Sequence, residues 1–364
     1  TLAATSVPGE PASDEPAPTE PPAAIAQATI PPGITPLDLS QPIQMVDPAL
    51  LAATQLNPGF EAGAQIGGVT SSILQVGRMG LTWVKMDVRY QLGQASTSYI
   101  QSITEAQANG FKVLLNVTGD PFEFMGTDRA VYLGGYVQFV GELAALGVDG
   151  IEVWYGMNGR MTAAEYVQLL GYTYHAIKTA NSQTLVITGA LRPVTNPETP
   201  AEDAETYYTQ LGDAQIAQYA DCIGVAYTLG TVSPTSTTGD PRGDSPVYYL
   251  STLTERARQA AQRPDGSTLP LCFTRLGYLS SEGYDPLPDD FAWAQPITAA
   301  QQAQWITETI QLGQTHAQAR LLIIWSLDAA YFGGGSPEAG YAIIRPDGSC
   351  PACDAIAITL TAEE

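Results

Sequence analysis

Four acidic side chains stand just after predicted β-strands, where carboxyl groups can serve as a general acid or a general base. They are Asp120, Glu123, Glu282 and Asp328. Two carboxyl groups about 6.5–9.5 Å apart leave room for the water molecule that an inverting hydrolysis needs. Acidic loop residues are common in a chain with 37 acidic and 15 basic residues, so we interpret these four as solvated surface.

Charged side chains alternate with apolar ones along the second predicted strand. Lys85, Asp87 and Arg89 share one face of it, because the side chains of a strand alternate between its two faces. Charges that faced apolar helices would be costly, so we expect the three to point into the interior of a closed sheet. Glu152 holds an inward-facing position on its own strand. The predicted result is a buried network, joined near its upper end by Arg275, that we interpret as structural pairing rather than as a ligand site.

Eight β-rich runs alternate with amphipathic helical stretches from about residue 59 onward. The runs cover residues 60–67, 82–89, 112–118, 150–155, 184–190, 222–227, 269–275 and 321–327. Helical patterns include residues 97–109, 131–146, 162–180, 247–262 and 299–318, with Thr97, Thr162 and Thr298 as expected N-caps. This order predicts an α/β fold, a (β/α)8 TIM barrel with the helices outside. The alternative is a doubly wound open sheet, but no Gly-x-Gly-x-x-Gly sequence follows the first run to support a dinucleotide site.

A proline-rich stretch precedes this regular pattern. Residues 1–48 hold 11 of the 27 prolines, and the first basic residue of the chain is Arg78. A segment rich in Pro, Ala, Thr and Glu lacks the side chains for a packed core and favours extended conformations. We therefore expect an extended arm or linker over residues 1–48 and a barrel over residues 49–364. The arm is either a disordered stalk that tethers the barrel to a cell surface or a contact with a neighbouring subunit.

The charge of the chain excludes two classes of partner. The formal net charge is −22, and only three residues are lysines. Such a surface repels nucleic acids and anionic lipid headgroups, because both are bound through cationic patches. No apolar run reaches the roughly 20 residues of a membrane-spanning helix, so we expect no membrane span. Residues 1–30 lack the pattern of a signal peptide, and we expect the numbering to start at a processed N-terminus.

Four cysteines favour an oxidising compartment. Cys350 and Cys353 lie close together in a tail rich in Gly and Pro, which predicts a local disulfide. Cys222 and Cys272 fall on neighbouring predicted strands, where they are either bonded or merely buried. We expect no metal site, because a second Cys or His pair is missing and both histidines fall in helical patterns far from any cysteine. We also expect no cofactor.

The fourth predicted strand carries a resemblance to a known family. It reads Gly150-Ile151-Glu152-Val153-Trp154-Tyr155-Gly156-Met157-Asn158, which resembles the W-N-E-P-N motif of retaining glycoside hydrolases, and the beta-xylosidase-like and biofilm-polysaccharide-hydrolase-like branch fits best. Segments 83–89, 220–227, 274–278 and 340–349 resemble the second, sixth and seventh strands and the close of that barrel. The resemblance spans about residues 59–356. It implies a TIM barrel whose site lies at the carboxyl ends of the strands.

The residues that perform the chemistry of that family are replaced in this chain. The acid/base glutamate of the family aligns with Gly156, the asparagine before it with Tyr155, the nucleophilic glutamate with Arg275 and the histidine of strand six with Ala226. Retaining hydrolysis needs two carboxyl groups about 5–5.5 Å apart. Glycine has no proton to donate, and arginine stays protonated and cannot attack a sugar. The resemblance therefore predicts a barrel without catalytic residues, and we expect no glycosidase activity by the mechanism of the family.

Aromatic side chains gather at the carboxyl ends of the predicted strands. They are Trp154, Tyr155, Tyr227, Tyr278, Trp325 and Tyr331. Flat rings stack on the faces of sugars, so all of these except Tyr331, together with Asn158 and Arg275, form the predicted substrate-binding site. The alternative is that an inherited cleft keeps its aromatic residues as packing although nothing binds there.

Three functions stay open. The first is a non-catalytic extracellular or cell-surface protein that is structural or self-assembling, in which residues 1–48 join copies into a homo-oligomer, a closed ring or an open filament. The second is a secreted carbohydrate-binding protein that holds a polysaccharide at the top of the barrel, where Arg275 favours acidic sugars through a bidentate contact. The third is a glycoside hydrolase with relocated carboxylates.

Overall fold

The structure of the chain is a computed structural model. It describes residues 32–44, 46, 59–194, 203–315, 318–328, 332 and 336–361, all of which belong to one compact unit, residues 31–364. Residues 1–31 of the predicted arm lie outside the described residues, as do His316 and Tyr331. The predicted boundary at residue 48 therefore stays a prediction.

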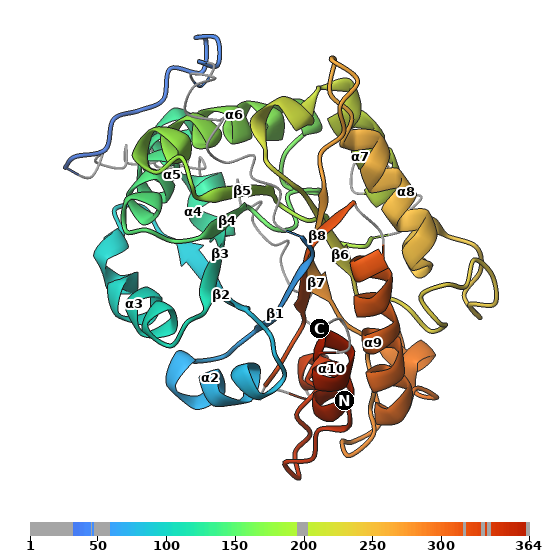
Figure 1. Cartoon of the computed structure of the whole chain (residues 1–364). Coiled ribbons are helices and arrows are strands. Elements are labelled where there is room, and N and C mark those ends of the chain that lie inside the picture. Colours follow the sequence, from blue (N-terminus) through green and yellow to red (C-terminus); the bar gives the residue numbers. More distant parts are fainter. Residues whose placement is uncertain are drawn as a thin grey trace, which may run out of the picture. The chain divides into compact units, whose positions relative to one another are not determined.

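Eight parallel strands form the sheet at the centre of this unit (Figure 1). They are β1 (Glu61–Gln65), β2 (Trp83–Tyr90), β3 (Lys112–Gly119), β4 (Gly150–Val153), β5 (Leu185–Thr188), β6 (Ile223–Tyr227), β7 (Leu271–Leu276) and β8 (Ala319–Ile324). Their order in the sheet is β5-β4-β3-β2-β1-β8-β7-β6. The two ends of this order meet, because Ile187 pairs with Cys222 in an isolated bridge and the amide of Thr188 donates to the carbonyl of Cys222 at 3.1 Å. The sheet is a nearly closed barrel, which confirms the predicted (β/α)8 fold.

Helices alternate with the strands and surround them (Figure 1). They are α2 (Val69–Arg78), α3 (Ile100–Ala108), α4 (Pro121–Gly126), α5 (Arg129–Ala145), α6 (Ala163–Ala180), α7 (Ala204–Asp213), α8 (Leu250–Ala260), α9 (Ala299–Thr315) and α10 (Pro351–Thr361). Thr162 caps α6 in a reciprocal pair with Glu165, and Thr298 accepts a backbone amide at 3.1 Å just before α9. The predicted cap at Thr97 is wrong, since this residue lies inside a 3-10 turn and α3 begins at Ile100.

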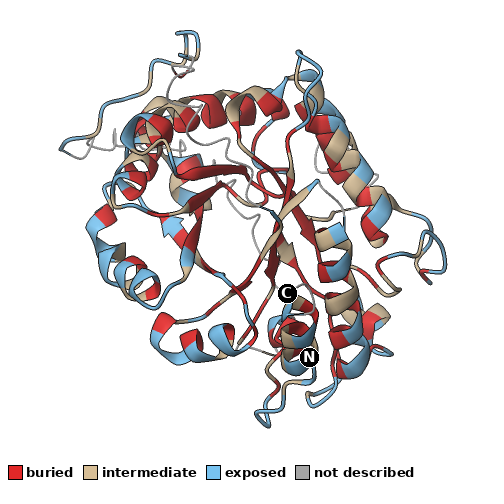
Figure 2. Cartoon of the chain, in the orientation of Figure 1, coloured by how far each residue is buried: buried red, intermediate tan, exposed pale blue. Residues whose placement is uncertain are grey.

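Apolar side chains pack on both sides of the barrel wall. Outward-facing strand residues meet the inner faces of the helices in one large cluster, while the outer helix faces are exposed (Figure 2). A second, smaller cluster fills the lumen near the amino-terminal ends of the strands: Trp83, Leu114, Leu185, Ile187, Cys222, Cys272, Leu321 and Ile323. The lumen is thus a packed core, and the carboxyl ends of the strands form the mouth of the barrel.

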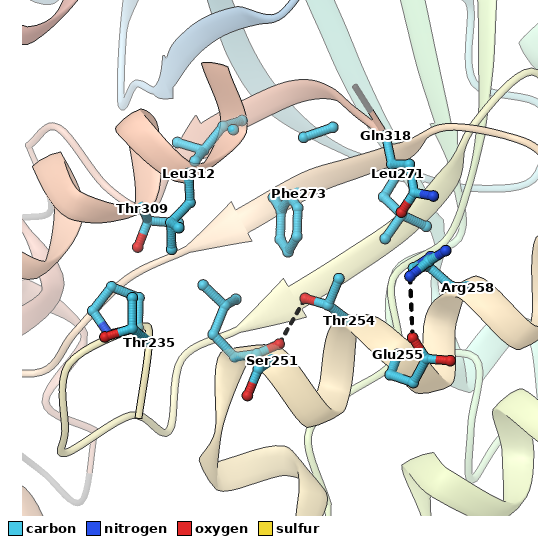
Figure 3. Close-up of a pocket in the computed structure, with 15 residues that line it drawn as sticks. Thr235, Ser251, Thr254, Glu255, Arg258, Leu271, Phe273, Thr309, Leu312 and Gln318 are labelled. Atoms are coloured by element: carbon cyan, nitrogen blue, oxygen red, sulfur yellow. Dashed lines mark hydrogen bonds and ion pairs between the residues drawn. The ribbon is translucent and has the colours of Figure 1, made fainter. Parts of the chain in front are cut away.

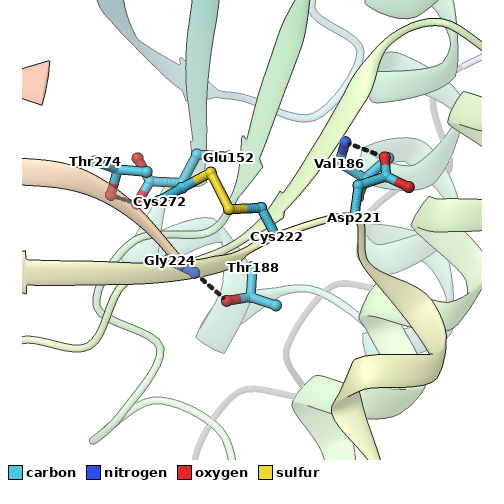
Figure 4. The surroundings of a disulfide bond; sticks show 8 residues. All are labelled: Glu152, Val186, Thr188, Asp221, Cys222, Gly224, Cys272 and Thr274. Carbon is cyan, nitrogen blue, oxygen red and sulfur yellow. Dashed lines mark hydrogen bonds between the residues drawn. A yellow bond between two sulfur atoms is a disulfide. The ribbon is translucent and has the colours of Figure 1, made fainter. Parts of the chain in front are cut away.

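Two disulfides pair all four cysteines. Cys350–Cys353 lies at the start of α10, which confirms the predicted local disulfide. Cys222–Cys272 joins the residue before β6 to β7 inside the lumen, close to Glu152 (Figure 4). Of the two possibilities that the sequence left open for this second pair, the structure shows the bonded one.

A buried ion pair joins β2 to β4 inside the barrel. The ammonium group of Lys85 lies 2.7 Å from Glu152 Oε2, and neither side chain is exposed. Lys85 also donates to the carbonyl of Thr274 on β7 at 2.9 Å. Glu152 Oε1 accepts from the hydroxyl of Thr274 at 2.8 Å and from the amide of Ala190 at 3.1 Å. These bonds supply partners for two charges that are removed from water.

Part of the predicted arm lies on the outside of its own barrel. Residues 32–44 follow α5 and α6, and several hydrogen bonds hold them there (Figure 1). Gln168 Nε2, for example, donates to the carbonyl of Leu39 at 2.7 Å. Ile43 packs against Gly171, where a Cβ atom would lie 2.6 Å from the isoleucine side chain, so this close approach requires glycine.

We predict that Lys85→Met lowers the free energy of unfolding by about 3–5 kcal/mol, because it leaves the Glu152 carboxylate buried without its cation. Chemical denaturation measures the loss. In the double variant Lys85→Met/Glu152→Gln no charge remains, and part of the loss should be recovered. Equal instability of the single and double variants would show that the packing, rather than the unpaired charge, accounts for the loss.

Candidate functional site

The charged side chains of β2 become more exposed from the core of the barrel toward its mouth. Lys85 is buried, whereas the side chain of Asp87 is 45% exposed and that of Arg89 is 67% exposed. The predicted buried network is therefore correct for Lys85 and Glu152 and wrong for Asp87 and Arg89. The reason is that the filled part of the lumen ends below these two residues, so they line an open surface.

Arg275, close to the end of β7, holds its guanidinium group between two aromatic rings. The guanidinium carbon lies 4.1 Å from the ring centre of Tyr155 and 4.4 Å from that of Trp325. These residues follow β4 and β8, so three strands contribute to one stack. Aromatic faces attract cations, most strongly where water is excluded. Three of the predicted site residues thus come together at the mouth.

A β-bulge explains how Arg275 reaches the mouth. The register between β6 and β7 shifts between Val225 and Ala226, which leaves Thr274 as the extra residue. The hydroxyl of Thr274 reaches Glu152 in the lumen, and the next side chain, Arg275, also turns inward. A regular strand would send two consecutive side chains to opposite faces.

The guanidinium group of Arg275 has no hydrogen-bond acceptor among the residues that the structure describes. Its Nε is buried without a partner, and Asp87 Oδ2 is 3.8 Å from its nearest terminal nitrogen. Asp87 instead accepts from Gln65 at 2.8 Å and from Asn116 at 2.7 Å. Burial alone would lower the pKa of Arg275, but Tyr155 and Asp87 outweigh it and raise the pKa above its ordinary value. The cation therefore persists.

Gly156 lies beside a second arginine. It adopts a left-handed backbone conformation with φ of 70°, and its amide donates to the carbonyl of Ala190 at 2.8 Å. A Cβ atom on Gly156 would lie 2.8 Å from Cγ of Arg192, so the stem of this arginine covers the position. Arg192 Nη2 donates to the carbonyl of Asn158 at 3.1 Å, and its Nε is buried with no partner in the described part of the chain.

Trp154 turns away from the mouth. Its φ of 65° is rare for a residue with a side chain. In a regular strand Trp154 would point inward like Glu152, as the predicted site requires, but this backbone conformation turns its side chain outward. The ring packs with its centre 4.9 Å from that of Phe124 and 5.0 Å from that of Tyr136. It also covers Gly119, where a Cβ atom would lie 2.2 Å from the indole. The structure thus places Trp154 in the packing between β3, α4 and α5.

Three further predicted site residues are buried: Asn158, Tyr227 and Tyr278. The side chain of Asn158 accepts from the amide of Arg192 at 2.9 Å and donates to its carbonyl at 3.0 Å. Tyr227 donates to the carbonyl of Tyr248 at 2.9 Å, and its ring meets that of Tyr278 edge-on. These contacts hold loops together, and none of the three side chains is accessible from the mouth.

The four acidic side chains expected on solvated surface hold loops and helix starts. Asp120 caps α4, and Glu282 accepts the first amide of α9 at 2.7 Å. Glu123 accepts a backbone amide at 2.7 Å from the loop after β2, and Asp328 accepts the amide of Gly67 at 2.9 Å. Each carboxylate has a structural partner, so their place at the loops reflects local hydrogen bonding.

A cavity of about 390 Å³ lies outside the barrel, between α8 and α9 (Figure 3). Leu271, Phe273 and Leu322 line it from the outer face of β7 and β8. None of the predicted site residues lines it, and its lining comes from the outer face of the sheet, whereas the mouth lies at the carboxyl ends of the strands. It is therefore separate from the candidate site.

The described residues offer cations and amide donors rather than a metal centre. Within them, no three His, Cys, Asp or Glu side chains are close enough together to hold a metal ion. No described helix is both long and apolar enough to cross a membrane. The described charged groups of the candidate site include the guanidinium groups of Arg275 and Arg192 and the carboxylate of Asp87.

Comparisons with known proteins agree on the fold. No protein-family model matches the chain, and no curated protein matches it. A solved family 39 glycoside hydrolase from Bacteroides cellulosilyticus is similar, with a TM-score of 0.62 and 14% identity over 83% of this chain and 64% of that chain. A family 5 glycoside hydrolase from Streptomyces cattleya, solved with Manβ1-4GlcNAc, has a TM-score of 0.60 and 15% identity over 84% of this chain and 82% of that one.

A fungal β-1,4-galactanase is also similar, with a TM-score of 0.54 and 13% identity over 82% of this chain and 98% of that chain. The chain spans less than two thirds of the length of the family 39 enzyme. Identities this low establish the fold alone. The chain has the (β/α)8 barrel that these glycoside hydrolases share, as the resemblance of its motifs predicted.

Arg192 is the residue of the candidate site that the sequence pattern did not reveal. It follows the predicted strand 184–190 by two residues. Residues just beyond the carboxyl ends of barrel strands reach the mouth. That position is the signal that could have identified it.

We predict that Gly156→Ala destabilises the chain more than Gly147→Ala does. Both glycines have a positive φ, which costs an alanine about 1–2 kcal/mol. Only at Gly156 does the added Cβ meet another side chain, that of Arg192, which adds about 1–3 kcal/mol. Denaturant unfolding measures both losses.

The double variant Gly156→Ala/Arg192→Ala serves as the control. Relative to Arg192→Ala alone, its free energy of unfolding should fall only by the amount seen for Gly147→Ala. Equal losses for the two single variants would mean that the arginine stem does not cover Gly156.

Proposed function

We propose that this chain is a carbohydrate-binding barrel that does not hydrolyse its ligand. The observation that carries the proposal is the guanidinium group of Arg275, held between Tyr155 and Trp325 at the mouth of a barrel of the glycoside hydrolase type. In this fold the mouth is where ligands bind. A permanent cation, in the position that the resemblance gives to the nucleophile, binds a polar ligand but cannot attack it.

The carboxylates around the mouth support the absence of hydrolysis. Retaining and inverting mechanisms both need two carboxyl groups at a defined separation, about 5–5.5 Å or about 6.5–9.5 Å. Asp120, Glu123, Glu282 and Asp328 are each engaged by backbone amides. Asp87 accepts from two side-chain amides, so both of its carboxylate oxygens are engaged as well.

The cysteines support a location outside the cell or at its surface. All four are paired, one pair inside the barrel and one at the start of α10. Disulfides form and persist mainly in oxidising compartments. Polysaccharides of cell walls and matrices are available to a protein in that location.

We predict that the purified chain binds a polysaccharide without cleaving it. In affinity gel electrophoresis against neutral and acidic polysaccharides, at least one gel should retard it, while aryl-glycoside and reducing-sugar assays show no hydrolysis. Tyr155→Ala should lower the affinity about three- to tenfold, because it removes one of the two rings that position Arg275.

Leu74→Ala is the matched control, because this exposed residue lies on α2 away from the mouth. It should bind as the unchanged chain does. Retardation by no polysaccharide would contradict the binding function, and cleavage of any glycoside by the purified chain would contradict the absence of hydrolysis.

Self-association through residues 1–48 stays a separate prediction. Residues 32–44 lie on α5 and α6 of their own barrel. We therefore test residues 1–31 as the contact with another copy. The two functions do not exclude each other, since a surface-bound glycan receptor gains avidity when its copies are joined.

Removal of residues 1–31 tests this directly, because it keeps the segment that packs on the barrel. Sedimentation velocity over a range of concentrations should show assemblies for the full chain and a monomer for the shortened chain. The same sedimentation coefficient for both at every concentration would rule out an assembly through this segment.

A further inference from the structure

We propose that the ligand at the mouth is a polysaccharide containing uronic acid, and that Arg275 and Arg192 recognise its carboxylates. This inference rests on the proposed function, because it names the ligand class for the same site. It starts from the incomplete hydrogen bonding of the two guanidinium groups: Nε of each is buried without an acceptor in the described residues.

The two rings at Arg275 are engaged with the cation. The guanidinium carbon lies 4.1 Å from the ring centre of Tyr155 and 4.4 Å from that of Trp325. The ring of Trp325 also packs on Tyr341, with 4.4 Å between ring centres. The N–H groups of arginine lie in the guanidinium plane. A carboxylate approaching in that plane can accept two parallel hydrogen bonds.

The chain contains a completed version of this arrangement around Arg242. Its guanidinium carbon lies 4.0 Å from the ring centre of Tyr248 and 4.1 Å from that of Trp293. There the carboxylate of Asp240 accepts from Nε at 2.9 Å and from Nη2 at 2.7 Å. Arg275 has the same two-ring stack, but no described residue places a carboxylate at such a distance. At Arg275, a ligand carboxylate would take the role that Asp240 has at Arg242.

Arg192 supplies a second cation from the loop after β5. Its stem lies over Gly156, and Nη2 is held by the carbonyl of Asn158. Its Nε is buried and finds no acceptor in the described ranges. Two guanidinium groups from separate strands suit a polymer that presents acidic groups on more than one sugar unit.

An acidic polymer would be recognised at the mouth by direct contacts rather than by a positive surface. Only 15 of the 364 residues are basic against 37 acidic ones, so the protein as a whole repels anions. Arg89, Arg192 and Arg275 stand at carboxyl ends of strands. Asp120 lies 3.9 Å from Arg89 and Asp87 lies 3.8 Å from Arg275, so the mouth carries charges of both signs.

The planar fork of arginine favours a carboxylate over a sulfate ester. Two parallel N–H bonds match the two coplanar oxygens of a carboxylate. Both groups are anionic, so the experiment must distinguish binding of a carboxylate from binding of a sulfate ester. Dextran sulfate serves as the sulfated polymer.

The test measures binding of the full chain to polygalacturonate, alginate and hyaluronate by isothermal titration calorimetry. Each polymer is paired with its methyl-esterified counterpart, which keeps the sugar backbone and removes the charge. We expect at least one acidic polymer to bind about tenfold or more tightly than its ester, since charged hydrogen bonds are about twice as strong as neutral ones. Dextran sulfate should bind more weakly than that polymer.

Substitutions then assign the effect to residues. Arg275→Gln should lose about tenfold or more in affinity for the acidic polymer, and Arg275→Lys should lose less, because it keeps the charge without the fork. Arg192→Gln should lose about threefold or more. Arg78→Gln, which removes the same charge from an exposed position at the end of α2, is the matched control and should bind unchanged. Thermal unfolding verifies that each variant is folded.

The outcomes separate this inference from the proposed function. Equal binding of acidic polymers and their esters, or unchanged affinity in Arg275→Gln, would overturn the inference and leave a carbohydrate-binding barrel. Binding to dextran sulfate alone would overturn the carboxylate assignment. Binding to no polysaccharide, acidic or neutral, would overturn both.

Discussion

The ion pair between Lys85 and Glu152 is the interaction on which the upper half of the barrel depends. A lysine and a glutamate removed from water are tolerable only when each meets its counter-charge and further hydrogen bonds. Here Thr274 and Ala190 supply those bonds, so β2, β4, β7 and the segment after β5 converge on one point. Below it the lumen is apolar, and above it the mouth is polar and open to water.

Above this point lie Gly156 and Arg275, the positions to which the resemblance to retaining hydrolases assigns two glutamates. Arg275 lies within 4.4 Å of the ring centres of Tyr155 and Trp325, and the stem of Arg192 covers Gly156. Each of the two arginines thus has its own support from neighbouring residues. Arg242 also lies close to two aromatic rings, and there the carboxylate of Asp240 is hydrogen-bonded to the guanidinium group. The chain thus contains this motif once with a carboxylate of its own and once without one at hydrogen-bonding distance.

Periodicity predicted the barrel and the inward direction of Lys85 and Glu152, because a period of two is a strong signal in buried parallel strands. The same rule was wrong for Trp154, whose positive φ turns the ring outward. The place of Arg275 at the mouth was predicted from the resemblance, because a period of two gives Thr274 and Arg275 opposite faces and the bulge changes this. Both deviations depend on backbone conformations that residue types do not encode locally. The bond between Cys222 and Cys272 likewise needed the register of β6 and β7.

The barrel closes through one isolated bridge between β5 and the residue before β6, whereas each of the other neighbouring strand pairs shares at least three paired positions. Side chains add to this closure, because Asp221 accepts from the amide of Val186 at 2.8 Å and the hydroxyl of Thr188 accepts from the amide of Gly224 at 2.8 Å. Arg192 follows β5, and the disulfide ties β6 to β7, the strand of Arg275. The distance between the two arginines, and with it the spacing of acidic groups that a polymer must offer, therefore depends on how β5 and β6 are joined.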